Sequence, residues 1–276
     1  MLVKQMTVML SLIDADIVAY RCAAASENDP LEIAVVRTNE LMHRIIHDTG
    51  ATEYEAYLSG TDSYRKSLDP TYKANRTQER PRWLEHLREH LITHWKASVT
   101  QYIEADDALG IGAGRCAFND QAWVVASIDK DLKQLYGKHY NFVKNEWDFV
   151  SPLDAIKLFY KQMLIGDRSD NVFGVTGIGV VKAARAIDPL YEENDMFELV
   201  WNMYSDKQRF FTNAQLLWIL KQSDNPQEVL LHFLSLQLPD EAAKLLSSLI
   251  SPEMHDLGLE PIVPQTTTAW EVSGCQ

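Results

Sequence analysis

The stretch Val8-Met-Leu-Ser-Leu-Ile-Asp14-Ala-Asp16 predicts the fold of this chain, because it is a short apolar run that ends abruptly in two acids. Such a run is typical of a buried strand of a parallel sheet, with polar groups at its carboxyl end. The segment Trp123-Val-Val-Ala-Ser-Ile128 repeats the pattern and is followed by Asp129 and Asp131. We therefore expect two strands that deliver acids to the same edge of one sheet.

Helical patterns separate the strands. Apolar residues recur near the helical period over residues 31–47, and residues 102–113, 131–136 and 152–164 are also predicted to be helical. Residues 53–58 alternate like a further strand. Strands that alternate with helices predict an α/β fold with a mostly parallel central sheet and flanking helices. After about residue 165 we expect only helices, which divides the chain into an α/β core over 1–165 and a helical region over 166–276.

The composition excludes some classes of protein and leaves one apparent objection. The 276 residues contain no apolar run long enough to span a membrane, and three scattered cysteines favour a reducing, cytoplasmic location. The net charge of −13 argues against a nucleic-acid partner when it is taken alone. However, residues 186–276 hold 14 acids against 4 bases, which leaves only −3 on residues 1–185. The acidity is therefore concentrated away from most of the predicted α/β core.

Within that core, acids gather in four short segments, each at a strand end or a helix start. If the segments converge, their carboxylates would repel one another, and hard divalent cations such as Mg²⁺ or Mn²⁺ would relieve the repulsion. No His or Cys accompanies the acids, so zinc is not favoured. Any one of these segments alone is more often a solvated helix start than a site. The candidate ligands are Asp14, Glu104, Asp106, Asp107, Asp129, Asp131, Asp167 and Asp170.

A basic segment over residues 65–82 carries six Lys or Arg residues against two acids. Tyr72 lies within it, and Tyr64 and Trp83 flank it, so aromatic groups are interleaved with the charges. That mixture is suited to a groove that tracks a single nucleic-acid strand. A solvated helix face is the alternative interpretation. The bases are Arg65, Lys66, Lys73, Arg76, Arg80 and Arg82.

A glycine-rich turn, Gly174-Val-Thr-Gly177-Ile-Gly179, precedes an apolar helix that carries Lys182. It follows no predicted strand, so a dinucleotide-binding fingerprint is rejected. The pattern instead resembles a helix–hairpin–helix, in which backbone N–H groups at a helix start hold a phosphate without reading the base sequence. A purely structural turn is the alternative.

Taken together, these motifs resemble the 5′-nuclease family, which has a PIN-like fold. The family includes flap endonucleases, stand-alone bacteriophage 5′–3′ exonucleases and the 5′-nuclease domain of bacterial DNA polymerase I, with the phage enzymes the most similar of the three. The resemblance extends from about Leu10 to Ala186. Its parts are Asp14-Ala-Asp-Ile-Val-Ala-Tyr-Arg21, Tyr72-Lys-Ala-Asn-Arg76, Glu104-Ala-Asp-Asp107, Asp129-Lys-Asp131 and Gly166-Asp-Arg-Ser-Asp-Asn-Val-Phe-Gly-Val-Thr-Gly-Ile-Gly179.

The resemblance implies two divalent-metal sites and a DNA-binding surface. One site would be built around Asp14, Glu104, Asp106 and Asp107, and the other around Asp129, Asp131, Asp167 and Asp170, with some ligands acting through water. Lys73 and Arg21 match the family's contacts to the scissile phosphate. Asp62 is a further candidate ligand, although it lies closer to Arg65 than the family pattern has it, and Asp16 is not counted. DNA contacts are expected at Arg65, Arg76, Tyr72, Gly177, Gly179 and Lys182, with K⁺ often bound to the family's helix–three-turn–helix.

The implied activity is metal-dependent hydrolysis of DNA from duplex 5′ ends or flaps, and of RNA primers. The implied protein is a monomer in the cytoplasm, which for a phage protein is that of the host. Two alternatives stay open. A toxin-like PIN ribonuclease would usually lack the basic segment and the glycine turn, and a DNA-binding scaffold without catalysis would lack part of the acidic set.

Overall fold

The computed structural model describes residues 9–250 and has a six-stranded sheet at its centre, with strand order β3-β2-β1-β4-β5-β6. The first five strands in chain order are parallel to their neighbours, and β6 is antiparallel to β5. The mostly parallel sheet expected from the sequence is confirmed. The strands are β1 (Met9–Asp14), β2 (Glu53–Leu58), β3 (Ser98–Val99), β4 (Ala122–Ala126), β5 (Gly137–Asn141) and β6 (Glu146–Val150).

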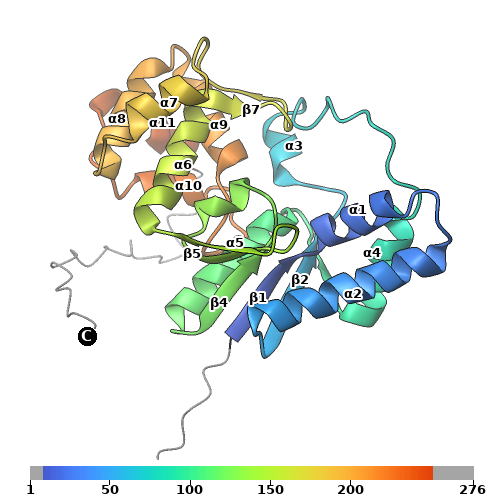
Figure 1. Cartoon of the computed structure of the whole chain (residues 1–276). Coiled ribbons are helices and arrows are strands. Elements are labelled where there is room, and N and C mark those ends of the chain that lie inside the picture. The colour runs from blue at the N-terminus through green and yellow to red at the C-terminus, as the bar shows by residue number, and fades with distance from the viewer. Residues whose placement is uncertain (1–8, 251–276) are drawn as a thin grey trace, which may run out of the picture.

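Helices cover both faces of this sheet (Figure 1). Side chains alternate along β1, so Ile13 packs with α1 (Ala15–Ala25), α2 (Leu31–Thr49) and α4 (Leu84–Trp95), whereas Leu12 packs with α5 (Ala105–Phe118). Both residues are fully buried. Burial on two faces explains why the central strands are continuous apolar runs.

A second core joins the helices of the C-terminal part, which lie together beside the sheet in Figure 1. It is rich in aromatic rings, including the fully buried Phe159, Trp201 and Phe210. Helix α6 (Pro152–Ile165) belongs to this core although the sequence placed it in the α/β part, and so does the side chain of Tyr64 in α3 (Tyr64–Leu68). The other helices are α7 (Val180–Ile187), α8 (Glu193–Met203), α9 (Lys207–Leu217), α10 (Glu228–Phe233) and α11 (Asp240–Leu249).

The elements differ from the sequence expectations in several places. Helices α1, α3 and α4 and the short strand β3 were not predicted. The β5–β6 hairpin was not predicted, because β6 is an exposed edge strand that lacks a buried apolar run. Residues 131–134 form a short 3₁₀ helix. The region after residue 165 does contain strands, β7 (Gly166–Asp167) and β8 (Val172–Phe173), which pair as a small hairpin. Within residues 9–250 no helix is long and apolar enough to cross a membrane.

Candidate active site

The acidic side chains meet at the carboxyl edge of the sheet because β1 and β4 are parallel neighbours that end together. Asp14 is the last residue of β1 and the N-cap of α1, where its Oδ1 accepts a hydrogen bond from the Ile17 N–H at 3.1 Å. Its Oδ2 accepts a hydrogen bond from Oγ of Ser127, just past β4, at 2.7 Å. Ser127 Oγ also accepts one from the Asp129 N–H at 3.0 Å. Ser127 therefore ties the two strand ends together, a role that no sequence motif indicated.

Electrostatic coupling shows which carboxylates lie near one another. Burial raises the pKa of Asp106 well above its usual value, and the charges of Asp14, Asp129 and Glu104 raise it further. Burial also raises the pKa of Asp131 to about 7, with further contributions from Asp129, Asp167 and Asp170. The structure thus brings together seven of the eight predicted acids. We call them the acidic cluster: Asp14, Glu104, Asp106, Asp129, Asp131, Asp167 and Asp170.

The acidic cluster is suited to a hydrated divalent cation. Asp106 accepts no hydrogen bond from any residue that the structure describes, so its oxygens are free to take a ligand. In the described part of the chain, no three acidic, His or Cys side chains are grouped closely enough to bind one ion as they stand. An ion here would therefore bind one or two carboxylates directly and retain several waters, which is how Mg²⁺ commonly binds. The all-oxygen donor set fits Mg²⁺ or Mn²⁺.

The basic segment supplies cations to one side of this cluster. Lys73 Nζ lies 2.6 Å from Oε1 of Glu104 and 3.6 Å from Oδ2 of Asp170. Burial alone would raise the pKa of Glu104, but the charges of Arg65 and Lys73 outweigh it and hold that pKa below its usual value. Arg76 pairs with Asp170 from the exposed side. Lys73 is thus placed beside two of the predicted metal-ligand carboxylates.

Tyr72 is buried, with 4% of its surface exposed, so its ring does not face solvent as a stacking platform would. Its hydroxyl instead lies 2.8 Å from Oδ2 of Asp170 and 3.0 Å from Oε2 of Glu104. The sequence pattern of aromatic residues among charges predicted a DNA contact here. Tertiary packing places this hydroxyl inside the acidic cluster.

Asp107 lies outside the cluster. Its carboxylate forms a two-pronged ion pair with the guanidinium of Arg65, at 2.5 and 2.8 Å, and both residues are buried. The same carboxylate accepts hydrogen bonds from the backbone N–H groups of Glu104 and Leu220. Arg65 also donates to the carbonyls of Leu216 and Trp218. The structure therefore places Asp107 and Arg65 in the buried junction of α5 with the helical core, where Arg65 also lies 3.6 Å from Oε2 of Glu104.

Helix geometry explains this difference. Glu104 is the N-cap of α5 and is not itself helical, so Asp107 at the third helical position turns back to cap it. Successive helical side chains are about 100° apart, so Asp106 and Asp107 point in different directions. Only one of them can face the cluster.

Three further residues of the sequence motifs are not members of the acidic cluster. Asp16 is held by Arg88 and by the Ser59 N–H, which agrees with its exclusion from the ligand set. Asp62 is exposed in the loop before α3. Arg21 is exposed on α1, two helical turns after Asp14.

The glycine turn leads into α7 as predicted. Gly177 has a φ of +79°, in the left-handed region that favours glycine, and Gly179 is the N-cap of α7. Lys182 Nζ donates a hydrogen bond to the carbonyl of Gly177 at 2.8 Å. Val180 and Val181 are about two-thirds exposed beside it. This end of the molecule presents backbone groups, a lysine and apolar side chains to solvent.

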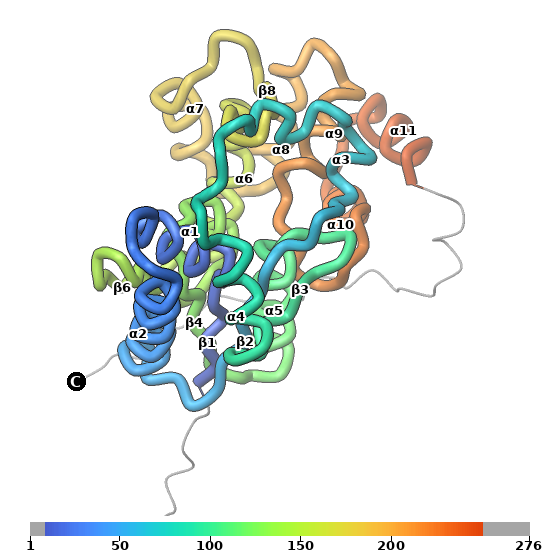
Figure 2. The backbone as a smooth tube through the Cα atoms, turned by 90° about the vertical axis from the view of Figure 1, so that its right-hand side faces the viewer, coloured from blue at the N-terminus to red at the C-terminus, as the bar shows by residue number. Residues whose placement is uncertain are grey.

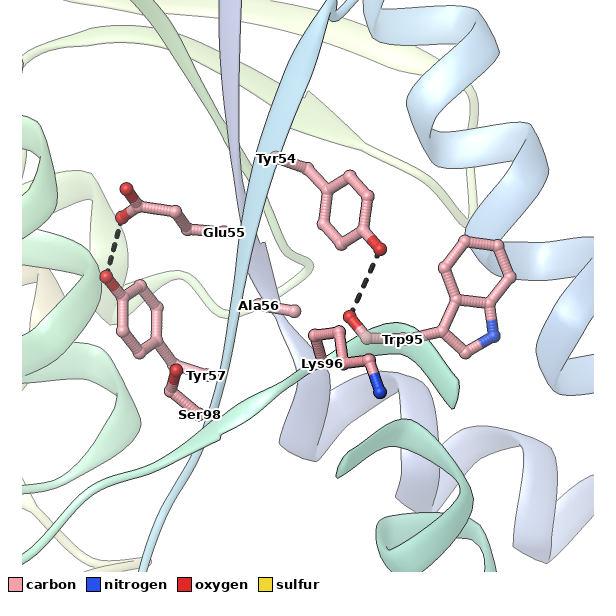
Figure 3. A pocket seen from close by; sticks show the side chains of 7 residues that line it. All are labelled: Tyr54, Glu55, Ala56, Tyr57, Trp95, Lys96 and Ser98. Atoms are coloured by element: carbon pink, nitrogen blue, oxygen red, sulfur yellow. Dashed lines mark hydrogen bonds between the residues drawn. The ribbon is translucent and has the colours of Figure 1, made fainter. Parts of the chain in front are cut away.

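A cavity of about 380 Å³ lies elsewhere, at the edge of β2 that the short strand β3 leaves uncovered (Figure 3). Figure 3 shows Tyr54 and Tyr57 on opposite sides of β2, where their hydroxyls donate to the Trp95 carbonyl and to Glu55, respectively. No member of the acidic cluster lines it. The candidate site is therefore the carboxylate edge of the sheet and not this cavity.

Comparison with known proteins defines the class of this fold and site. Residues 9–162 match the family model described as 5′-3′ exonuclease, N-terminal resolvase-like domain. Because this match covers more than half of the chain, the chain belongs to the 5′-nuclease family. The expectation from the sequence motifs is confirmed.

Two curated relatives show how far the likeness extends. The chain is 29% identical over 157 residues to flap endonuclease Xni of Shewanella sp. (strain W3-18-1), covering 51% of this chain and 58% of that protein. It is 29% identical over 201 residues to DNA polymerase I of Bacillus caldotenax, covering 64% of this chain and 23% of that one. The aligned regions thus span well under two-thirds of each relative.

Solved structures share the fold over most of the chain. A bacteriophage T5 flap endonuclease in a pseudo-enzyme-product complex with DNA and metal ions matches with a TM-score of 0.62 at 15% identity, covering 87% of this chain and 97% of that one. A T5 5′-exonuclease with bound divalent zinc matches with a TM-score of 0.58 at 16% identity, with the same coverage. At these identities the likeness concerns the fold.

Proposed function

We propose that the protein is a divalent-metal-dependent 5′–3′ exonuclease and flap endonuclease that hydrolyses DNA. The observation that carries this proposal is the convergence of seven carboxylates from separate segments of the chain, with the ammonium of Lys73 beside two of them, Glu104 and Asp170. Family membership supports the same activity.

Two ions are assigned to the acidic cluster. One would lie among Asp14, Glu104 and Asp106, and the other among Asp129, Asp131, Asp167 and Asp170. Each ion would bind one or two of these carboxylates directly and the others through water. When bound, such ions supply a water that ionises near neutral pH and positive charge beside the reacting phosphate. Asp107 is left out of this set because its oxygens are already taken by Arg65 and two backbone N–H groups.

The chain's own cations bind and orient the scissile phosphate. Lys73 would exchange its contact with Glu104 for a phosphate oxygen. Arg21 would approach the same phosphate from α1, the helix that Asp14 caps. In the reaction, the water oxygen forms a bond to phosphorus and the bond from phosphorus to the 3′ oxygen breaks. The water's proton passes to solvent, and the 3′ oxygen takes up a proton. The products are a 3′-hydroxyl and a 5′-phosphate.

The glycine turn and α7 are proposed to bind the duplex part of the substrate. Gly177, Gly179 and Lys182 are exposed there, so their backbone N–H groups and the lysine are accessible to a phosphate. Carbonyls of the same turn are candidates for a K⁺ ion. The helical region that follows residue 165 would then be a DNA-binding region, and Arg76 would contact the strand that enters the cluster. RNA primers and a role in phage replication are further parts of this proposal.

A 5′-labelled flapped duplex tests the proposal. We expect release of the labelled flap with Mg²⁺ and none with EDTA. Asp129→Ala and Asp170→Ala should abolish cleavage while DNA binding is retained, whereas Asp224→Ala, at an exposed acid outside the cluster, should cut at the wild-type rate. Cleavage of RNA alone would favour the PIN ribonuclease, and binding without cleavage would favour the scaffold. Full activity of Asp129→Ala would refute the metal assignment.

A further inference from the structure

Two asparagine side chains fasten the basic segment to the turn over residues 166–171. Asn75 Nδ2 donates a hydrogen bond to the carbonyl of Arg168 at 2.7 Å. Asn171 Nδ2 donates one in the opposite sense, to the carbonyl of Thr71 at 2.9 Å. Each segment thus contributes one side-chain amide and one backbone carbonyl. Figure 2 shows the chain between α3 and α4 running beside β8, where this contact forms.

A backbone contact lies between these two bonds. The Lys73 N–H donates to the carbonyl of Asp170 at 2.9 Å. Lys73 and Asn171 both have φ near +60°, a conformation that costs free energy in residues other than glycine. Such backbone conformations persist when surrounding contacts hold them. The two asparagine bonds are contacts of this kind: in the basic segment they join at Thr71 and Asn75, one on each side of Lys73, and one of them is made by Asn171 itself.

The two asparagine bonds hold the backbone around Lys73 without contacting its ammonium group. The backbone bond joins Lys73 directly to Asp170, and the Lys73 ammonium reaches Glu104 at 2.6 Å. Neither asparagine contacts a carboxylate of the acidic cluster. Both could therefore be replaced while every charged group of the site is kept.

We propose that Asn75 and Asn171 are positioning residues that hold the ammonium of Lys73 at the acidic cluster. This inference rests on the proposed nuclease function, in which Lys73 binds the scissile phosphate. Holding a charged group in its reactive place avoids an entropic cost during the reaction. The two bonds are exposed to solvent, so each contributes modestly and the segment opens more often when either is lost.

Limited trypsin digestion tests the docking in the absence of substrate. Lys73 and Arg76 are trypsin sites inside the docked segment, and Asn171→Ala leaves the sequence around both unchanged. We expect cleavage after these residues to be about 3- to 10-fold faster in Asn171→Ala and Asn75→Ala, which is the effect of losing one modest hydrogen bond. Each trypsin cleavage rate is divided by the rate for the same protein after heat denaturation. This division removes any effect that the Asn75 substitution has on trypsin's recognition of the neighbouring Lys73 and Arg76. Gln78→Ala, at an exposed neighbour, should match the wild type.

Flap cleavage with Mg²⁺ tests the positioning itself. We expect kcat to fall about 3- to 10-fold in each asparagine variant while KM stays within about twofold, because the charges that bind DNA remain. A thermal unfolding midpoint close to that of the wild type would show that the effect is local. Gln78→Ala should leave kcat and KM unchanged.

The outcomes separate the two proposals. Wild-type kcat and wild-type trypsin rates in Asn171→Ala would overturn the positioning role while the nuclease assignment stands. A rise in KM alone would also overturn it, because it would place the asparagines in DNA binding. Absence of Mg²⁺-dependent cleavage by the wild type would overturn the proposed function itself, and the trypsin rates would still decide whether the two segments are docked.

Discussion

The ammonium of Lys73 lies 2.6 Å from Oε1 of Glu104, so a cation from an irregular segment neutralises a carboxylate at the N-terminus of α5. We expect Lys73→Ala to lower the cleavage rate about 10²- to 10³-fold, the usual effect of removing one group that stabilises developing charge. Single-turnover cleavage of a flapped duplex measures it. Lys66→Ala is the matched control, because Lys66 is exposed and contacts only a backbone carbonyl. Equal losses in both variants would contradict a specific role for Lys73.

The Arg65–Asp107 pair should be important for stability. Arg65→Ala leaves the carboxylate of Asp107 buried without its counter-charge, and we expect the free energy of unfolding to fall by about 3–5 kcal/mol. Urea unfolding measures this.

The Mg²⁺ concentration needed for half-maximal activity should stay the same in Asp107→Asn and rise in Asp106→Asn. An equal rise in this concentration in both variants would show that Asp107 is a metal ligand after all.

Divalent ions should stabilise the fold more at high pH than at low pH. Burial raises the pKa of Asp14 and of Asp131 from 3.8 to about 7, so the folded protein binds more protons than the unfolded chain between those values. Without metal, these two groups therefore make stability fall as pH rises from about 4 to about 7. Mg²⁺ should offset that loss, so its effect on Tm should be larger at pH 8 than at pH 5.5. A Tm increase independent of pH would contradict this coupling.

Lys182 should contribute to binding of duplex DNA irrespective of its sequence. We expect Lys182→Ala to weaken binding of several unrelated duplexes by a similar factor. The slope of the logarithm of the binding constant against the logarithm of the salt concentration should become shallower by about one. Fluorescence anisotropy at several salt concentrations measures both effects. Lys144→Ala, at an exposed lysine near the β5–β6 turn, is the control and should leave the slope unchanged.

Sequence patterns predicted β1, β2 and β4 because burial leaves apolar or alternating runs in strands. They also predicted α2, α5 and α6, because amphipathic helices leave a clear apolar period, whereas α1, α3 and α4 were not predicted. The hairpin of β5 and β6 was missed. Its outer strand exposes four of its five residues, so solvent imposed no apolar pattern there. The short β7–β8 hairpin has only two residues in each strand, too few for any periodicity.

That acids follow β1 and β4 could be predicted from the amino-acid order alone, because a polar residue directly after a buried apolar run is visible in the sequence. The family could be predicted in the same way, since the order of the motifs survives without any structure. Which members of each motif face the site depends on how the segments pack in three dimensions. Asp106 and Asp107 are chemically identical neighbours, yet the turn of the helix directs one toward Asp14 and the other toward Arg65. The same holds for Tyr72, Asn75 and Asn171, whose partners lie about 30 to 100 residues away and are set by how the segments pack.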